Sequence, residues 1–246
     1  LQKNHPQTYR WENVLEELEN ASNLYKENGF KQKKDAEDLV KKLSANGMEA
    51  TLVASEKKKE KKAPPMLYNL AELQNDCSSL FKISPSDTLK IVQELYEKKL
   101  VTYPRTDARV LSTAVAKEIY KNISGLKRYT PMAAYADEVL NMGSYKTIAK
   151  TKYVNDKQIT DHYAIIPTGQ GMGALRGLSE IAANVYEIIC RRFLSIFYPA
   201  TEYQKLSMTL AKQDEFLFAN FKYMLKEGYL KVATNRFARK KDDTKY

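Results

Sequence analysis

Apolar residues recur at intervals of three and four along much of the chain, the spacing that places them on one face of an α-helix. In the stretch that follows Ser84-Pro85, for example, Leu89, Val92 and Tyr96 form one such stripe. Comparable stripes predict helices at about residues 11–18, 34–45, 67–80, 85–96, 113–123 and 130–142, and a long one that opens at Ser179. Thr130 precedes Pro131 and is expected to be an N-cap. The middle of the chain is therefore mainly helical.

Strands are predicted on either side of this helical region. The first covers Glu49–Ser55, and beyond Pro199 apolar and polar residues alternate, which predicts two further strands joined at Gln213-Asp214. Between the first strand and the helices, the lysine-rich run 57–62 leads to two prolines that end regular structure. We interpret this run as a linker or a solvated edge, and contact with a DNA backbone is the alternative.

These elements predict a mixed α+β fold in which a mainly helical domain is inserted between β-containing segments. The helical domain is expected at residues 67–197, and residues 29–66 and 198–246 are expected to form one β-containing domain together. Residues 1–28 are interpreted as the remnant of a preceding region, because the chain begins without a methionine and looks cut from something longer.

The composition fits a globular protein with a hydrophobic core of its own. The 246 residues are 43% apolar and 28% charged, and no run of 18 apolar residues occurs, which excludes a transmembrane helix. The two cysteines, Cys77 and Cys190, are too few for a disulfide framework or a cysteine metal site. We therefore expect reduced thiols, a cytoplasmic protein and no membrane partner.

The charge favours an anionic partner. Lys and Arg number 40 against 30 Asp and Glu, and the formal net charge of +10 is spread along the chain. Seventeen tyrosines accompany these cations, and aromatic rings interleaved with basic side chains suit stacking on single-stranded bases. Nucleic acid is the expected partner.

Two short strings carry more specific information. Residues 99–107 read KLVTYPRTD and residues 161–168 read DHYAIIPT. With PPMLYNL at 64–70, QELYEKK at 93–99 and RRFL at 191–194, they occur in the order found in type IA DNA topoisomerases. The sequence resembles that family, and within it the topoisomerase III branch.

The resemblance implies that residues 67–197 are the domain of the active-site tyrosine and that the flanking segments belong to an arch, or gate, domain. It makes Tyr103 the nucleophile that attacks a single-stranded DNA phosphodiester and forms a transient 5′-phosphotyrosyl link. An ordinary tyrosine has a pKa of about 10 and is only roughly one part in a thousand ionised at neutral pH, so a cation must assist it. Arg105, two residues further, would lie on the same side of an extended backbone. His162 is expected to contact the phosphate, so that Tyr103, Arg105 and His162 are the catalytic candidates.

The remaining DNA-binding candidates are Thr106, Asp107, Arg109 and Arg192, besides Arg105 and His162. Asp107 is expected either to orient Arg105 or to cap a turn. Two positions depart from the family pattern, since Ala108 stands where a serine is common and Tyr163 where a second histidine is common.

The family also implies Mg²⁺, bound by the acidic cluster of a TOPRIM domain. No Asp-x-Asp-x-Glu string occurs in this sequence, so we expect no metal ligands in this chain and name the missing TOPRIM domain as a partner within the same polypeptide. The glycine-rich stretch 168–173 lacks the Lys-Ser/Thr ending of a phosphate-binding loop and is interpreted as a mobile loop.

Two other functions remain open. A non-catalytic single-stranded nucleic-acid-binding module would keep the fold without the reaction. An RNA-binding or ribosomal protein would explain the charge but not the ordered motifs.

Overall fold

The computed structural model describes residues 32–45, 49–212, 215–234 and 237. The helix predicted near Trp11 and the turn predicted at residues 213–214 lie outside these residues. The chain divides into two compact units, one formed by residues 1–57 and 205–221 and the other by residues 58–204 and 222–246. We call them the first unit and the helical unit.

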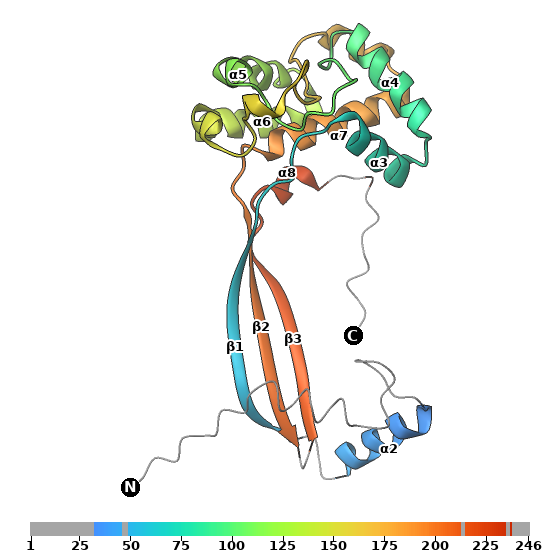
Figure 1. Cartoon of the computed structure of the whole chain (residues 1–246), viewed down its shortest axis with the longest axis vertical. Helices are drawn as coiled ribbons and strands as arrows, with labels where there is room; N and C mark the ends of the chain where they lie inside the picture. The colour runs from blue at the N-terminus through green and yellow to red at the C-terminus, as the bar shows by residue number, and fades with distance from the viewer. Residues whose placement is uncertain (1–31, 46–48, 213–214, 235–236, 238–246) are drawn as a thin grey trace. The chain divides into compact units, whose positions relative to one another are not determined.

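The helical unit contains the helices predicted at about residues 67–80, 85–96, 113–123 and 130–142 and the one that opens at Ser179, together with a short helix near its C-terminal end that was not predicted (Figure 1). Its α-helices are α3 (Leu70–Phe81), α4 (Pro85–Glu97), α5 (Thr113–Leu126), α6 (Thr130–Met142), α7 (Glu180–Ser195) and α8 (Leu230–Ala233). The stretch between α6 and α7 carries the 3₁₀ helices η2 (Ser144–Lys150), η3 (Asp156–Gln158) and η4 (Met172–Gly177).

Side-chain caps fix where several of these helices begin. The side chains of Asn69, Ser84, Ser112 and Ser179 each accept a hydrogen bond from a backbone N–H in the first turn, which satisfies a donor that the helix leaves unpaired. The prediction for Thr130 was wrong by one position. Tyr129 is the N-cap residue of α6, so Thr130 already lies inside the helix.

Helix α7 supplies much of the core. It packs against α3, α4, α6 and α8, and ten of its residues are buried. The large rings of Tyr186 and Phe193 are fully enclosed there. Burial of such side chains contributes about 1.5–3 kcal/mol each, which makes α7 the rigid base on which the neighbouring segments rest.

The three strands form one antiparallel sheet in the order β1-β2-β3. They are β1 (Thr51–Lys62), β2 (Thr201–Lys212) and β3 (Glu215–Lys226), and all the helices from α3 to α7 lie between β1 and β2 in the sequence. The mixed α+β class is therefore confirmed. The boundaries predicted at residues 29, 67 and 198 and the arch arrangement remain predictions.

Residues 57–62 are the second half of β1, so the lysine run is not a linker, whereas its interpretation as a solvated edge agrees with its exposed lysines and contact with a DNA backbone stays a prediction. β1 is an edge strand, where charged side chains extend into solvent and keep their hydration. Two ion pairs also hold the run to its neighbours, Lys61 with Glu202 at 3.2 Å and Lys222 with Glu60 at 3.2 Å.

The described part of the first unit has little buried surface. Its helix α2 (Lys33–Ser44) contains no buried residue, and Phe216 and Phe218 on β3 are exposed. An ion pair of 2.8 Å links Lys42 of α2 to Glu215 of β3. Within the described ranges, we find no helix whose length and apolar character would suffice to cross a membrane.

Candidate active site

The two motif strings, far apart in the sequence, lie side by side in the helical unit. The backbone N–H of Thr102 donates to the carbonyl of Ile166, and that of Thr168 donates to the carbonyl of Leu100, both at 3.0 Å. Val101 and Pro167 form an antiparallel bridge between these bonds. The pairing fixes the register of the two strings and so determines which of their side chains meet.

The side chain of Thr102 strengthens this pairing. Its hydroxyl donates to the carbonyl of Ala164 and accepts from the backbone N–H of Ile166, both at 3.0 Å. The hydroxyl of Thr106 makes the next link, to the carbonyl of His162 at 2.9 Å. Two hydroxyls of the KLVTYPRTD string, one on each side of Tyr103, therefore hold the DHYAIIPT string in place.

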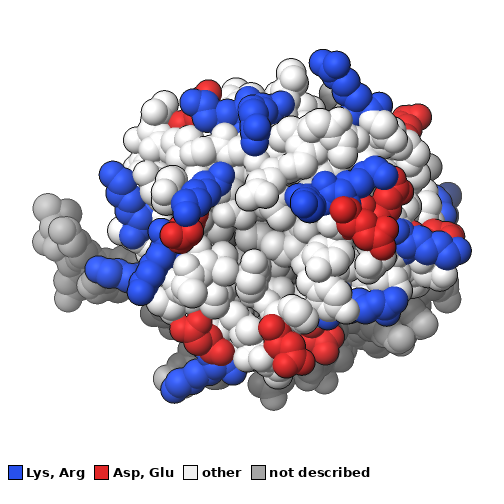
Figure 2. Space-filling model, turned by 90° about the horizontal axis from the view of Figure 1, so that it is seen from above, with Lys and Arg blue, Asp and Glu red and all other residues white. Residues whose placement is uncertain are grey.

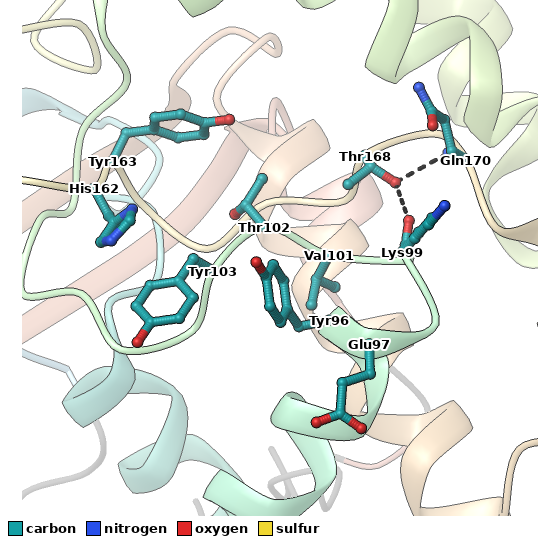
Figure 3. A pocket seen from close by; sticks show the side chains of 10 residues that line it. All are labelled: Tyr96, Glu97, Lys99, Val101, Thr102, Tyr103, His162, Tyr163, Thr168 and Gln170. Carbon is teal, nitrogen blue, oxygen red and sulfur yellow. Dashed lines mark hydrogen bonds between the residues drawn. The ribbon is translucent and has the colours of Figure 1, made fainter.

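This register brings Tyr103 and His162 together. Their ring centroids are 4.3 Å apart with planes tilted by 41°, and His162 is exposed at the surface. On its other side, the Tyr103 ring contacts Tyr96 of α4 edge-to-face, with centroids 5.5 Å apart. Tyr103 is thus held between two rings from different segments (Figure 3).

These rings line a pocket of about 500 Å³. The pocket is lined by Tyr96, Glu97, Lys99, Val101, Thr102, Tyr103, His162, Tyr163, Thr168 and Gln170. Tyr96 was predicted on the apolar stripe of its helix, but its side chain is 39% exposed and lines this pocket instead. No sequence signal distinguished it from Leu89 and Val92, because helical spacing does not show where a helix meets a cavity.

Backbone hydrogen bonds of Lys99 hold the rim of the pocket in place. Lys99 has a left-handed backbone with φ of 60°, its N–H donates to the carbonyl of Tyr96, and its carbonyl accepts from the Thr168 hydroxyl at 2.6 Å. At Gly171, with φ of 71°, a Cβ atom would lie 2.5 Å from the Lys98 carbonyl oxygen. Gly171 therefore allows close packing against the residues that follow α4.

Arg105 does not line this pocket. The backbone N–H of Thr106 donates to the carbonyl of Pro104 at 3.0 Å, which bends the chain at Arg105, so the extended backbone on which we placed Arg105 beside Tyr103 is not present. Arg105 is exposed and forms no ion pair with Asp107 or any other described residue. Its guanidinium is therefore open to an external anion.

Asp107 and Thr106 serve the fold in this structure. The backbone carbonyl of Asp107 accepts a hydrogen bond from the Asn69 amide at 3.1 Å, and the carbonyl of Thr106 accepts from the N–H of Leu70. Thr106 is buried, and its hydroxyl is already used by His162 and Ala108. These contacts tie the tyrosine string to the start of α3.

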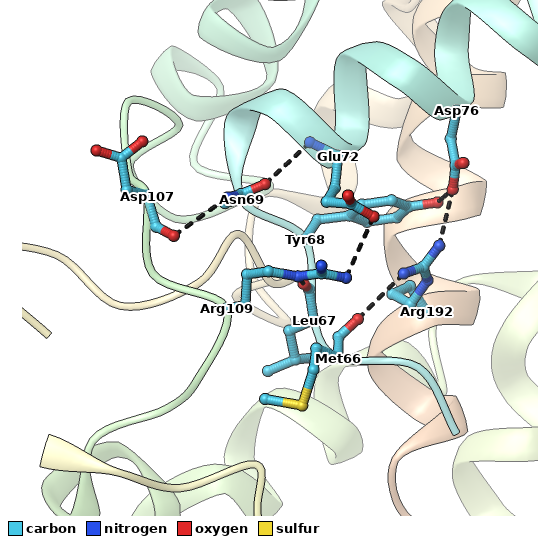
Figure 4. Close-up of polar contacts among 9 residues, drawn as sticks. All are labelled: Met66, Leu67, Tyr68, Asn69, Glu72, Asp76, Asp107, Arg109 and Arg192. Atoms are coloured by element: carbon cyan, nitrogen blue, oxygen red, sulfur yellow. Dashed lines mark hydrogen bonds and ion pairs between the residues drawn. The ribbon is translucent and has the colours of Figure 1, made fainter. Parts of the chain in front are cut away.

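Arg109 and Arg192 are engaged in contacts within the helical unit (Figure 4). Arg109 donates to the carbonyl of Leu67 and pairs with Glu72 at 3.2 Å. Arg192 donates to the carbonyl of Met66, pairs with Asp76 at 2.7 Å and lies 4.1 Å above the Tyr68 ring. Neither lines the pocket beside Tyr103.

A tyrosine that sequence reasoning did not single out completes this network. Tyr68 donates its hydroxyl to Asp76 at 2.5 Å, and its backbone carbonyl accepts from the N–H of Ile165. Burial raises the pKa of the Tyr68 phenol, and Asp76 raises it further while Arg192 acts in the opposite direction. The phenol therefore stays protonated and holds Tyr68 to Asp76 of α3, while the backbone carbonyl of Tyr68 holds the same residue to the DHYAIIPT string.

Charge on the face seen in Figure 2 is mixed. Basic and acidic side chains alternate around its edge, and the middle of the face carries uncharged residues. Within the described residues, no group of three or more His, Cys, Asp or Glu could hold a metal ion. The described side chains therefore do not fit a Mg²⁺ site.

Comparison with known proteins agrees with the motif order. The family described as DNA topoisomerase matches residues 4–246. The chain is 35% identical over 209 residues to DNA topoisomerase 3 of Bacillus cereus, which covers 83% of this chain and 27% of that protein. It is 35% identical over 201 residues to DNA topoisomerase 3 of Bacillus subtilis, which covers 80% of this chain and 27% of that protein.

A solved structure shares the fold. Full-length topoisomerase I from Thermotoga maritima superposes with a TM-score of 0.59 at 23% identity, over 87% of this chain and 34% of that one. The chain thus spans about a quarter of the length of the curated relatives that it matches. On the family match and the ordered motifs, it belongs to the type IA DNA topoisomerases and is similar to their topoisomerase III branch.

Proposed function

We propose that this chain carries the nucleophile of an ATP-independent DNA topoisomerase that cuts and reseals one DNA strand. Tyr103 attacks a phosphodiester of single-stranded DNA, another strand passes through the break, and the reverse reaction restores the strand. The observation that carries the proposal is the contact between Tyr103 and His162, which the pairing of two distant motifs creates at the edge of a pocket.

The reaction conserves the number of phosphoester bonds. The Tyr103 oxygen forms a bond to phosphorus while the 3′-oxygen of the preceding nucleotide leaves, which gives a 5′-phosphotyrosyl link and a free 3′-hydroxyl. The phenolic proton is lost and the 3′-oxygen gains one. Because negative charge builds on the phosphate oxygens, a donor from His162 and the open guanidinium of Arg105 would stabilise the transition state.

The whole activity requires parts beyond these residues. We propose single-stranded DNA as the substrate, a TOPRIM domain of the same polypeptide as the partner, Mg²⁺ as its ion, and the cytoplasm as the compartment. The described residues show no metal site, and no step above passes through the metal. The roles of Thr106, Asp107, Arg109 and Arg192 in DNA binding remain predictions, and their present contacts favour support of the fold.

The direct test is Tyr103→Phe in the full-length protein, which removes only the attacking oxygen. We expect the variant to keep its fold and DNA affinity and to form no covalent adduct with a labelled oligonucleotide after denaturation. Tyr120→Phe on α5 is the matched control, because Tyr120 is exposed and does not line the pocket. A Tyr103→Phe protein that still becomes labelled would refute the assignment. A wild-type protein that binds the labelled oligonucleotide but forms no covalent adduct with it would favour the alternative function, a non-catalytic single-stranded nucleic-acid-binding module.

The 246-residue chain alone is expected to bind single-stranded DNA with micromolar or weaker affinity and not to cleave it. Its basic side chains would neutralise phosphates whatever the base sequence, and each neutralised phosphate releases counterions. The logarithm of the association constant should therefore fall linearly with the logarithm of the salt concentration, with a slope of roughly 0.7 per phosphate neutralised. Fluorescence anisotropy at several salt concentrations measures this slope. Adduct formed by the chain alone would mean that its residues already contain a complete catalytic site.

A further inference from the structure

We propose that the pocket beside Tyr103 holds the nucleobase adjacent to the phosphate under attack, stacked on the ring of Tyr96. This inference rests on the proposed function and names the part of the substrate that the pocket receives. The space of about 500 Å³ lies within the range of ligand pockets, and its walls carry four rings, those of Tyr96, Tyr103, His162 and Tyr163. Every nucleobase has a π-face that such rings can stack on.

Charge decides between a base and a phosphate as the occupant. The pocket contains the carboxylate of Glu97 as well as the ammonium group of Lys99, so it is not a cationic site for an anion. Glu97 would repel a phosphate oxygen, whereas its carboxylate and the amide of Gln170 match the donors and acceptors on the edge of a base. Arg105, which lies outside the pocket, leaves the phosphate a separate place to bind.

Tyr96 is the ring best placed for stacking. Its edge-to-face contact with Tyr103 fixes the ring orientation, while 39% of the residue remains exposed to the pocket side and solvent. The Tyr103 ring, by contrast, is only partly exposed and contacts rings on both sides. A base stacked on Tyr96 would therefore lie next to the nucleophile and adjacent to the phosphate that Tyr103 attacks (Figure 3).

Backbone contacts within the helical unit hold the walls of the pocket. The left-handed backbone of Lys99 and the hydrogen bond from Thr168 to its carbonyl hold one wall. Gly169 closes the region behind it, since a Cβ added to Gly125 of α5 would lie 2.1 Å from the Gly169 carbonyl oxygen. A preformed wall lowers the cost of ordering the site when the base enters.

The test combines a protein variant with single abasic sites in the DNA. A labelled oligonucleotide with one cleavage position is prepared intact and with an abasic site at each flanking nucleotide in turn. Adduct formation is measured for full-length wild-type protein, Tyr96→Ala, Tyr96→Phe and the exposed control Tyr120→Ala. We expect Tyr96→Ala to lower the rate about 5- to 150-fold on intact DNA, the range that corresponds to roughly 1–3 kcal/mol for stacking of one base.

The decisive result is the coupling between the two changes. One abasic position should lower the wild-type rate by a similar factor and cause no further loss in Tyr96→Ala, while Tyr96→Phe and Tyr120→Ala behave like wild type. If the two losses multiply at every abasic position, Tyr96 acts only by holding Tyr103 and the proposal is wrong. Failure of the proposed function is recognised separately, by an adduct that forms in Tyr103→Phe.

Discussion

The helical unit and the first unit differ in how much of their surface is buried. In the helical unit, α7 alone buries ten residues, and the paired motif strings rest on elements that pack against it. In the described part of the first unit, α2 buries none and the aromatic residues of β3 are exposed. The candidate pair Tyr103 and His162, whose proposed chemistry needs fixed distances between side chains, lies in the unit whose core can hold them.

The largest expected effect concerns the two residues of the helical unit that we propose to contact the phosphate. His162→Ala and Arg105→Ala in the full-length protein should each reduce DNA cleavage by about 10²-fold or more, the scale for loss of one preorganised donor to a developing charge. Single-turnover adduct formation measures the effect, and the exposed Arg176→Ala variant of η4 serves as control. A near-wild-type rate for His162→Ala would mean that the DHYAIIPT string has only a structural role, and a near-wild-type rate for Arg105→Ala would mean that its guanidinium does not assist cleavage.

Two phenylalanines compare the units directly. Phe193 of α7 is fully buried, so Phe193→Ala should lower the free energy of unfolding by about 3–5 kcal/mol. Phe218 of β3 is 47% exposed, and Phe218→Ala should cost less than about 1 kcal/mol. Urea unfolding of both variants gives the two values. Equal losses would mean that β3 is as deeply packed in solution as α7.

Two glycines sharpen the comparison within the helical unit itself. A Cβ at Gly125 would meet the backbone of Gly169 at 2.1–2.5 Å, so Gly125→Ala should destabilise the protein by about 1–3 kcal/mol. Gly173 has no heavy atom within 4 Å of its Cβ position, and Gly173→Ala should change the stability by less than about 0.5 kcal/mol. Thermal unfolding provides the measurement, and an unchanged midpoint for Gly125→Ala would contradict the close approach of these backbones.

Much of the helical unit was predictable because its signals are local. Ser84 and Ser179 cap the helices that they precede, and Val92 and Val185 of the apolar stripes are buried where the spacing placed them, although Tyr96 is exposed. The identity of the two motif strings was also visible from their residues. Their contact was not derivable from spacing, since the hydrogen bonds of Thr102 and Thr106 to residues of the second string form only in the folded chain.

Other features depended on partners that sequence alone does not reveal. The lysine run becomes a strand because it pairs with β2, which is distant from it in the sequence. Arg192 was a candidate for DNA contact because it is a cation in a family motif. In the fold it pairs with Asp76, beside the ring of Tyr68.

The pairing of the two motif strings also determines which parts of the gene can vary in length. Because backbone hydrogen bonds from Thr102 and Thr168 set the register locally, the distance between Tyr103 and His162 does not depend on how many residues separate them. Residues can therefore be added or removed at turns of the intervening chain, such as that at Gly143 after α6, without moving Tyr103 and His162. One residue added inside either string would instead turn alternate side chains to the opposite face and separate the two rings.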